Sequence, residues 1–286
     1  MTSTSTEATA EATAAASGAS ATERFQRDKQ ITATVSQERV STLATDLLTA
    51  VHDVVRRHRA TYEEYNALKA WLIRVGEDGE WPLFLDVWVE HVLEEVVNSS
   101  REGTKGTIEG PYYVPRAPSL PADADLPHRE GERGTPLLFQ GQVRDLDGRP
   151  VPAATIEVWH ADDEGYYSQF APGIPEWNLR ASVVADGDGT FRIRTIQPAP
   201  YQIPTDGACG ALITAAGWHA WRPAHLHLKV SAPGSRTITT QLYFAGGQHV
   251  DDDIAQAVKP ELVLTPQPAA DGSGHEVTYD FVLDPA

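Results

Sequence analysis

The segment His225-Leu-His227-Leu carries two histidines separated by a single residue, the clearest chemical feature of this 286-residue sequence. On a β-strand, residues two apart point to the same face, so the imidazoles of His225 and His227 would project together. This is the geometry of a metal chelate. Two histidines on the solvent-facing side of a strand would give the same pattern, so the remaining ligands must decide between these interpretations.

Two sets of residues could supply the remaining ligands. The first is His160 and Asp162, whose His-x-Asp spacing is that of an iron(II) centre completed by a distant histidine. The second is tyrosine, offered by the segment Gly165-Tyr-Tyr-Ser168 and by Tyr201. A phenol has a pKa of about 10, so only a strongly Lewis-acidic hard ion such as iron(III) would hold it as phenolate at neutral pH. Tyrosines of a β-fold are more often packed aromatic residues, and spacing alone does not choose between the sets.

The elements that position these residues are predicted to be strands. After Gly103, apolar and polar residues alternate in short runs, separated by turn sequences about every ten residues. The runs cover residues 137–143, 154–159, 182–184, 191–195, 225–230, 237–244 and 277–283. Because no helical period intervenes, the pattern predicts a mainly β fold with an antiparallel β-sandwich at its core.

Residues 36–100 have helical periodicity instead. Apolar residues three and four apart predict a first helix, and Thr61 with Glu64 has the spacing of a capping box at the start of a second. A third helix is predicted over residues 81–98. It carries more apolar surface than a lone surface helix needs, so we expect it to be buried against the rest of the chain or against a second subunit.

Composition limits the classes of function. The formal net charge of −17 at pH 7 would repel phosphate-rich partners, so we expect no nucleic-acid ligand. The single cysteine, Cys209, cannot form an intramolecular disulfide and favours a reducing, cytoplasmic location. No run of about 18 apolar residues occurs, so a membrane protein is not expected. Residues 1–20 lack the charged start of a secretory signal, and we expect residues 1–24 to be a disordered tail.

Five segments, in order and with family-like spacing, resemble the intradiol ring-cleavage dioxygenases, and within that family most closely the enzymes acting on catechol. They are residues 107–113 (TIEGPYY), 156–168 (IEVWHADDEGYYS), 195–207 (TIQPAPYQIPTDG), 221–228 (WRPAHLHL) and 239–243 (TTQLY). The resemblance implies that dioxygen cleaves catechol between its two hydroxyl-bearing carbons, giving cis,cis-muconate. It also implies a helical dimerisation and linker domain at 25–105 and a β-sandwich catalytic domain at 106–286.

By the same resemblance, four residues hold one non-haem iron(III) per chain: Tyr167, Tyr201, His225 and His227. Tyr167 is favoured over Tyr166 because the family's ligand directly precedes the serine, here Ser168. His160 and Asp162 then become structural residues beside the site.

The resemblance also assigns catalytic and substrate-binding residues. Arg222 matches the family's active-site arginine, whose guanidinium can stabilise negative charge on the substrate ring, and Gln241 matches a residue near that arginine. Tyr201, on leaving the metal, would take a proton from the substrate. The ring pocket is expected to be walled by Arg222 together with Leu83, Asp86, Ile108, Gly110, Pro111, Tyr112, Ile203, Pro204, Ile254 and Ala255.

Several alternatives remain open. Hydroxyquinol and chlorinated catechols are other substrates used within the family. Outside it, an iron(II)/2-oxoglutarate-type oxygenase could use His160, Asp162 and a distal histidine, and residues 141–154 have a strand–turn–strand pattern common to transthyretin-like binding modules. The apolar helical stripe, with the family precedent of a helical interface that encloses a lipid, suggests a homodimer formed through about residues 36–100 and a phospholipid bound there.

Overall fold

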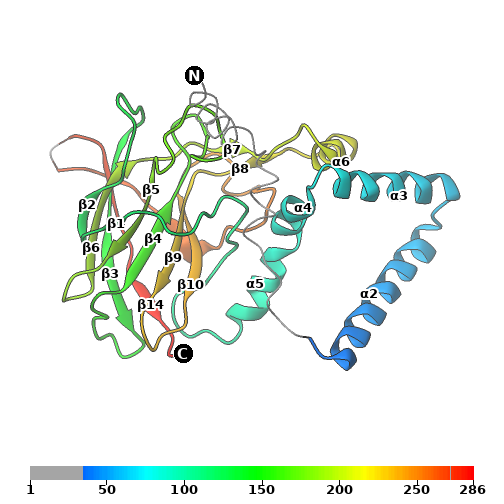
Figure 1. Ribbon diagram of the computed structural model, residues 1–286, viewed down its shortest axis with the longest axis horizontal. Helices are drawn as coiled ribbons and strands as arrows, with labels where there is room; N and C mark the ends of the chain where they lie inside the picture. Colours follow the sequence, from blue (N-terminus) through cyan, green and yellow to red (C-terminus); the bar gives the residue numbers. More distant parts are fainter. Residues whose placement is uncertain (1–34, 271) are drawn as a thin grey trace, which may run out of the picture. The chain divides into compact units, whose positions relative to one another are not determined.

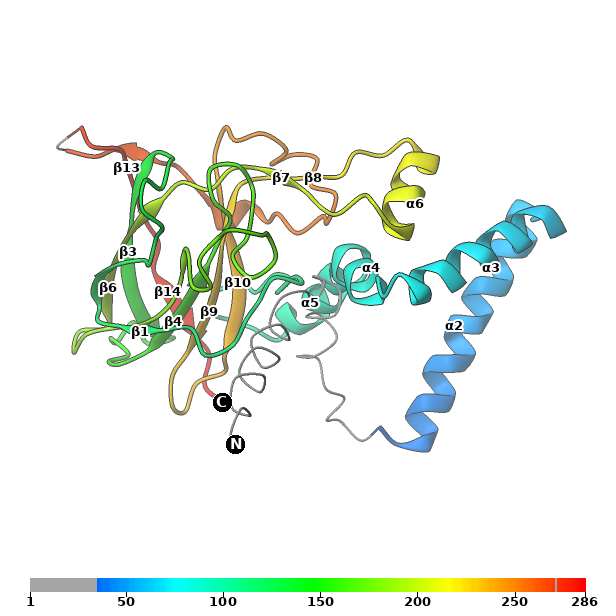
Figure 2. The same ribbon diagram turned by 45° about the horizontal axis from the view of Figure 1, so that its top comes forward.

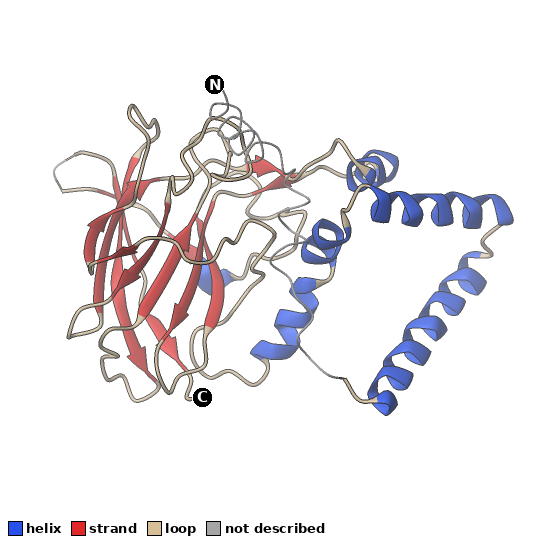
Figure 3. Ribbon diagram, viewed as in Figure 1, coloured by secondary structure: helices blue, strands red, loops and turns tan. Residues whose placement is uncertain are grey.

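The computed structural model describes residues 35–270 and 272–286, which form two compact units, one ending at Trp81 and one running from Pro82 to Ala286. The expected tail at residues 1–24 lies outside the described residues. Figure 3 separates the two kinds of structure: the early part of the described chain is helical, and strands dominate the second unit. None of the helices in the described ranges combines the length and the apolar character that a membrane crossing requires.

The first unit contains two helices, α2 (Gln37–His58) and α3 (Tyr62–Glu77), drawn in blue and cyan in Figure 1. The predicted capping box at the start of α3 is confirmed. The Thr61 amide donates to Glu64 Oε2 at 2.7 Å, and the Glu64 amide donates to Thr61 Oγ1 at 3.2 Å. Two amides that the helix itself cannot satisfy are thus paired, which is why α3 begins here.

An apolar stripe runs along α2 and is exposed in the single chain. Its residues recur every three or four positions, as the sequence pattern predicts. They are Val40, Leu43, Leu47, Val51 and Val54, which are between 48% and 66% exposed. No residue of α2 is buried. Most helical stability in proteins comes from packing of an apolar face, so this stripe lacks the covering surface that such a helix usually has.

Two short helices follow, α4 (Trp81–Trp88) and α5 (Glu90–Asn98), and the boundary between the two units falls after the first residue of α4. The prediction of one helix over 81–98 is wrong at Val89, whose φ of −126° and ψ of −37° interrupt it. Three residues of α4 are buried: Leu83, Asp86 and Val87. Three apolar residues of α5 are exposed: Val92, Leu93 and Val96. The apolar residues of this segment therefore do not share one buried face.

Two six-stranded sheets lie as neighbouring layers in the second unit (Figures 1 and 2). The first has the order β1 (Ser119–Leu120), β5 (Arg180–Val184), β4 (Thr155–Trp159), β9 (His225–Ser231), β10 (Ile238–Phe244) and β11 (Val263–Leu264). The second has the order β12 (Gln267–Pro268), β13 (His275–Thr278), β3 (Pro136–Asp145), β6 (Thr190–Ile196) and β2 (Asp123–Asp125), with β14 (Phe281–Leu283) also paired to β3. Strands β7 (Tyr201–Gln202) and β8 (Trp221–Arg222) form a separate ribbon, α6 (Ala208–Ala216) falls between them in the sequence, and the 3-10 helix η1 (Pro260–Leu262) precedes β11.

The mainly β prediction is confirmed, but antiparallel pairing throughout is wrong, because the sheets are mixed. The antiparallel neighbours include β4 with β5, β9 with both β4 and β10, and β3 with β6. The parallel neighbours are β1 with β5, β10 with β11, β2 with β6, and β3 with both β13 and β14. Parallel neighbours need long connections rather than tight hairpins. Alternation in the sequence indicates a buried face and carries no information on strand direction.

Side chains from both sheets form one apolar core. On β9, the core-facing residues are Leu226, Leu228 and Val230, each 0% exposed. His225 and His227 take the alternate positions, as predicted, and are buried as well. Strand β9 is thus covered on both faces, and its two histidines are 1% and 0% exposed.

Candidate metal centre

The register of the first sheet places four residues in one row. Across β5, β4, β9 and β10, this row contains Arg180, Trp159, His227 and Gln241. Residues paired directly across neighbouring strands have their side chains on the same face. The indole of Trp159 accordingly stacks on the imidazole of His227, with ring centroids 4.8 Å apart and planes inclined by 7°. His227 is therefore held in one orientation by the sheet.

His225 and His227 approach each other through their Nε2 atoms, which are 3.0 Å apart. His225 Nδ1 lies 2.7 Å from the carbonyl oxygen of Pro223, which can only accept, so Nδ1 carries the ring proton and Nε2 presents a lone pair. Burial and then the charge of Arg222 lower the pKa of His225 to about 3. Burial also lowers the pKa of His227. Both rings are neutral at pH 7, which is the form that binds metals.

Tyr167 and Tyr201 lie beside these histidines. The Tyr167 hydroxyl is 3.1 Å from His227 Nε2, and the Tyr167 and Tyr201 rings meet edge to face with centroids 5.4 Å apart. The ring centroid of Tyr201 is 5.6 Å from that of His225. Burial raises the pKa of both tyrosines, so neither phenol ionises at neutral pH without a strong positive charge beside its oxygen.

The turn before Tyr167 requires a glycine. Gly165 has φ +89°, and a Cβ atom there would lie 2.8 Å from the Cβ atom of Tyr201. A side chain at this position would be strained and would also push Tyr201 out of place. Gly165 therefore permits the close approach of the two segments that carry the tyrosines.

Two imidazole nitrogens and two phenol oxygens thus converge in a buried space, as the sequence motifs predict. Two donors, each about 2.1 Å from a metal ion, lie about 3 Å apart when they bind at right angles. The Nε2–Nε2 distance of 3.0 Å and the Nε2–hydroxyl distance of 3.1 Å match that spacing. A mixed nitrogen and oxygen set suits a transition metal such as iron rather than calcium or magnesium. The residues present fit a transition-metal ion.

His160 and Asp162, the alternative ligands, have their polar atoms engaged elsewhere. His160 Nδ1 lies 2.7 Å from the carbonyl oxygen of Ala161, and Nε2 lies 2.7 Å from the hydroxyl of Thr195. Asp162 accepts hydrogen bonds from two backbone amides of the turn that follows it and forms an ion pair with Arg129 at 2.9 Å. These contacts stabilise the chain beside the tyrosine and histidine cluster and do not support an iron(II) site on these two residues.

A further group of metal-type side chains consists of His219, His249 and Asp252. The amide of Trp221 donates to His219 Nδ1 at 3.1 Å, so His219 Nε2 carries the ring proton, and this atom lies 3.4 Å from Asp252 Oδ2. His249 Nδ1 lies 3.0 Å from the other Asp252 oxygen. These three side chains are therefore linked to one another by polar contacts at the surface, at a place separate from the tyrosine and histidine cluster.

Arg222 is a buried cation beside the candidate ligands. Its Nε and Nη2 atoms donate to the two carboxylate oxygens of Asp253 at 3.0 and 3.1 Å. Nη2 also donates to Gln241 Oε1 at 2.9 Å, and the Tyr243 hydroxyl donates to the same oxygen at 2.8 Å. Nη1 lies 3.4 Å from His225 Nε2. The guanidinium is therefore held on one side by a carboxylate and an amide and faces the cluster on the other.

Three residues that position the site are not identified by the sequence analysis. Asp253 closes a run of three aspartates, which is typical of an exposed turn, and Tyr243 belongs to an ordinary strand pattern. Glu90 on α5 accepts hydrogen bonds from the amides of Glu109 and Gly110, at 3.0 and 3.4 Å. No spacing rule links these residues to the histidines, because they reach the site only through tertiary folding.

Comparison with known proteins identifies the family. A family model described as "Dioxygenase" matches residues 108–285, and one described as "Catechol dioxygenase N terminus" matches residues 37–105. This chain belongs to the intradiol ring-cleavage dioxygenases. The resemblance drawn from the sequence motifs is confirmed, and with it the enzyme class; the family depends on non-haem iron.

The relatives of this intradiol dioxygenase include enzymes for different diols. A chlorocatechol 1,2-dioxygenase of Rhodococcus opacus is 39% identical over 255 residues, covering 87% of this chain and 99% of the relative. A catechol 1,2-dioxygenase of Acinetobacter baylyi is 36% identical over 230 residues, covering 77% and 72%. Among solved structures, the 3-chlorocatechol 1,2-dioxygenase of Rhodococcus opacus 1CP superimposes with a TM-score of 0.83 at 42% identity, covering 88% of this chain and 100% of that chain.

Besides Arg222, two of the expected pocket residues of the dioxygenase lie beside the candidate ligands. A Cβ atom added to Gly110 would lie 3.5 Å from His227 Cε1. The ring of Tyr112 stacks on Tyr167, with centroids 4.3 Å apart. The remaining wall residues are buried or half-buried, and their part in substrate binding stays a prediction: Leu83, Asp86, Ile108, Pro111, Ile203, Pro204, Ile254 and Ala255.

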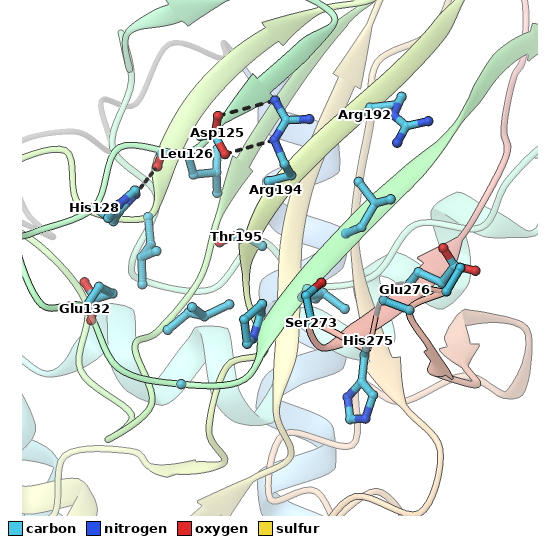
Figure 4. Close-up of a pocket in the computed structure, with 18 residues that line it drawn as sticks. Asp125, Leu126, His128, Glu132, Arg192, Arg194, Thr195, Ser273, His275 and Glu276 are labelled. Atoms are coloured by element: carbon cyan, nitrogen blue, oxygen red, sulfur yellow. Dashed lines mark hydrogen bonds and ion pairs between the residues drawn. The ribbon is translucent and has the colours of Figure 1, made fainter.

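A separate cavity of about 610 Å³ lies in the dioxygenase against β3 and β6, and none of the four candidate ligands lines it. Figure 4 shows Arg194 at this cavity, paired with Asp125. Thr195, which also lines it, bonds to His160 and so connects the cavity wall to the neighbourhood of the cluster. The second arginine of the cavity, Arg192, lies 3.8 Å from Asp123. Because both arginines are paired with aspartates, the cavity offers little free charge to an anionic ligand.

Proposed function

We propose that this intradiol dioxygenase acts on chlorinated catechols, as a chlorocatechol 1,2-dioxygenase. The sequence motifs predict catechol as the preferred substrate, with chlorocatechols and hydroxyquinol as alternatives. The comparisons favour the chlorinated alternative, because the chlorocatechol enzymes combine the higher identity with nearly complete coverage of their own length. That combination carries the proposal.

We propose that four residues hold one iron(III) per chain: Tyr167, Tyr201, His225 and His227. Their convergence, the lone pair on His225 Nε2 and the burial of all four support this assignment. An iron(III) ion held there would supply a Lewis acid for a diol substrate and make the substrate ring more reactive toward dioxygen. Two phenolates would offset most of the ion's charge, which suits a buried site.

The roles of the protein residues follow from their placement. A diol that binds through both oxygens must lose two protons. We assign one of them to the phenolate form of Tyr201, whose ring lies beside those of Tyr167 and His225. Arg222 keeps a positive charge in the same space, because Asp253 and Gln241 hold its guanidinium. We assign Arg222 to the stabilisation of negative charge on the substrate ring, and Gln241 to the orientation of Arg222.

The assembly and location are part of the same proposal. The exposed apolar stripe of α2 supports a homodimer formed through the helical region, with a phospholipid as an expected component of the interface. The single cysteine, Cys209, is buried and supports a reducing, cytoplasmic location. Light scattering at micromolar concentration, with mass spectrometry of extracted lipid, tests the assembly; a monomer would contradict it.

The substrate proposal is tested by steady-state kinetics on iron-loaded protein. The kcat/KM values for 3-chlorocatechol, 4-chlorocatechol, catechol and hydroxyquinol are measured side by side from oxygen uptake. We expect the highest value for a chlorocatechol. A higher value for catechol or hydroxyquinol would overturn the substrate assignment. A protein that binds no iron and cleaves none of the four diols would overturn the metal assignment as well.

A further inference from the structure

Arg180 is a buried cation that the proposed reaction does not use. It lies on β5 and is 1% exposed, one of the largest fully buried side chains of the protein. Within the described residues, none of its bonds goes to a carboxylate: its acceptors are a hydroxyl and two carbonyl oxygens. A buried charge without a counter-charge is costly, so its presence calls for a compensating gain.

The three acceptors of Arg180 belong to two residues that adjoin Tyr167: Ser168, its neighbour in the sequence, and Tyr112, its neighbour in space. Nε donates to Ser168 Oγ at 2.7 Å, and Nη2 donates to the Ser168 carbonyl oxygen at 3.1 Å. Nη1 donates to the carbonyl oxygen of Tyr112 at 2.6 Å. Ser168 directly follows Tyr167, and the Tyr112 ring stacks on Tyr167. One rigid guanidinium thus joins the two segments that fix the orientation of the Tyr167 ring.

The charge of Arg180 also lies close to Tyr167. The guanidinium carbon is 5.7 Å from the centroid of the Tyr167 ring and 5.7 Å from that of Phe170. Burial lowers the pKa of Arg180 to about 10, and Tyr167 opposes this shift, so the side chain remains charged at pH 7. The sheet register brings it here, since Arg180 is paired with Trp159, which is paired with His227.

We propose that Arg180 is a positioning residue for the metal centre, which orients Tyr167 through Ser168 and Tyr112 and supplies the positive charge that matches the negative charge of Tyr167 as a ligand. The inference rests on the proposed function, because it takes Tyr167 to be a ligand of iron(III). It explains why an arginine is retained in a buried position where no carboxylate pairs with it. It also separates two contributions, geometry and charge, that substitutions can test one at a time.

Two variants separate these contributions. Arg180→Gln removes the charge and most of the hydrogen bonds, and Arg180→Lys keeps the charge but loses the planar fork. Arg144→Gln is the matched control, because Arg144, also on a strand of the second unit, pairs with Asp280 at 3.4 Å and its side chain is 42% exposed. Thermal unfolding of each apo variant by circular dichroism establishes that it is folded. Iron affinity is then measured by competition with a chelator, and the visible phenolate-to-iron absorption band of the iron-loaded protein is recorded.

We expect Arg180→Gln to bind iron about 10- to 100-fold more weakly, as for other losses of a residue that orients a metal ligand. Its band should move to longer wavelength, because electrons on the phenolate lie higher in energy without the neighbouring positive charge. Arg180→Lys should keep the band near its wild-type position and bind iron more weakly than Arg144→Gln.

The outcomes distinguish the two proposals. A wild-type protein without iron or a visible band overturns the proposed function. A coloured wild-type protein whose Arg180→Gln variant keeps both its iron affinity and its band position overturns only the inference about Arg180. If Arg180→Gln does not fold, Arg180→Lys decides: weakened iron binding in a folded protein supports the inference, and unchanged binding overturns it.

Discussion

Replacing Asp253 with asparagine tests the network behind Arg222. Both side chains are 2% exposed, and they share two hydrogen bonds of 3.0 and 3.1 Å. The amides of Ala255 and Ala257 donate to the same two carboxylate oxygens. Asparagine keeps the shape but loses the charge, and either orientation of its amide places an NH₂ group against a donor. Removing one partner of a buried ion pair costs about 3–5 kcal/mol.

This decrease in the free energy of unfolding can be measured as a change in Tm, the midpoint of thermal unfolding. In a domain of this size, 1 kcal/mol corresponds to about 2–4 °C, so Asp253→Asn should lower the Tm of the apo protein by about 6–20 °C. Asp252→Asn is the matched control, because this neighbouring carboxylate is 56% exposed and pairs with His219 and His249. Exposed pairs contribute at most about 1 kcal/mol. A Tm for Asp253→Asn equal to that of the control would refute the reasoning.

The same variant should change the kinetics and the acid stability. Arg222 remains but loses its orientation, so we expect kcat/KM to fall about 10- to 100-fold, less than the 10²–10³ that removal of a charge-stabilising donor costs. Burial raises the pKa of Asp253, but Arg222 and the Ala255 amide outweigh it and hold the pKa below its usual value. The stability from this pair is therefore present above about pH 4 and is lost as the pH falls through the lower folded pKa. Asp253→Asn should remove this pH-dependent contribution to the stability of the protein.

Four further substitutions test other parts of the structure. His160→Ala should leave the iron content near that of the wild type, whereas Tyr201→Phe should weaken the visible band. Metal analysis and absorption spectra check both expectations. Loss of iron from the His160→Ala variant alone would contradict the ligand assignment. Gly165→Ala should lower the free energy of unfolding by about 1–2 kcal/mol, because φ is +89° there. It should also reduce the iron content, because the new Cβ atom would clash with Tyr201. Thermal unfolding and metal analysis measure these two effects. Thr61→Ala removes the capping box and should weaken the start of α3 by about 0.5–2 kcal/mol, seen as faster amide hydrogen exchange at Glu64; unchanged exchange would show that the cap is not needed.

Local features of this protein were predictable from the sequence because their physics is local. The capping box of Thr61 and Glu64 involves atoms three residues apart, and the alternation of His225 and His227 follows from strand geometry. The mainly β composition of the second unit follows from the same period of two. Recognition of the motif segments added the tyrosines, which spacing alone left undecided.

Features that depend on long-range contacts were not predictable. The interruption at Val89 divides a periodic segment whose apolar pattern continues through it. The directions of β1, β2, β11, β13 and β14 depend on how long connections return to the sheets. Asp253 and Glu90 look like ordinary surface carboxylates until the fold brings them to Arg222 and Gly110.

By itself, the sequence determined the alternating strands and the shared face of His225 and His227, because these depend on residue type and short spacing. The resemblance of its motif segments indicated the family and added the two tyrosines to the candidate ligands. Only the tertiary structure decided which polar atoms are engaged and which are free. It paired both nitrogens of His160 while leaving His225 Nε2 with a lone pair toward the cluster, and it buried Arg180 beside Tyr167 without a carboxylate. The physical reason is that burial and hydrogen bonding, which set the charge and availability of these groups, arise from contacts between strands distant in the chain.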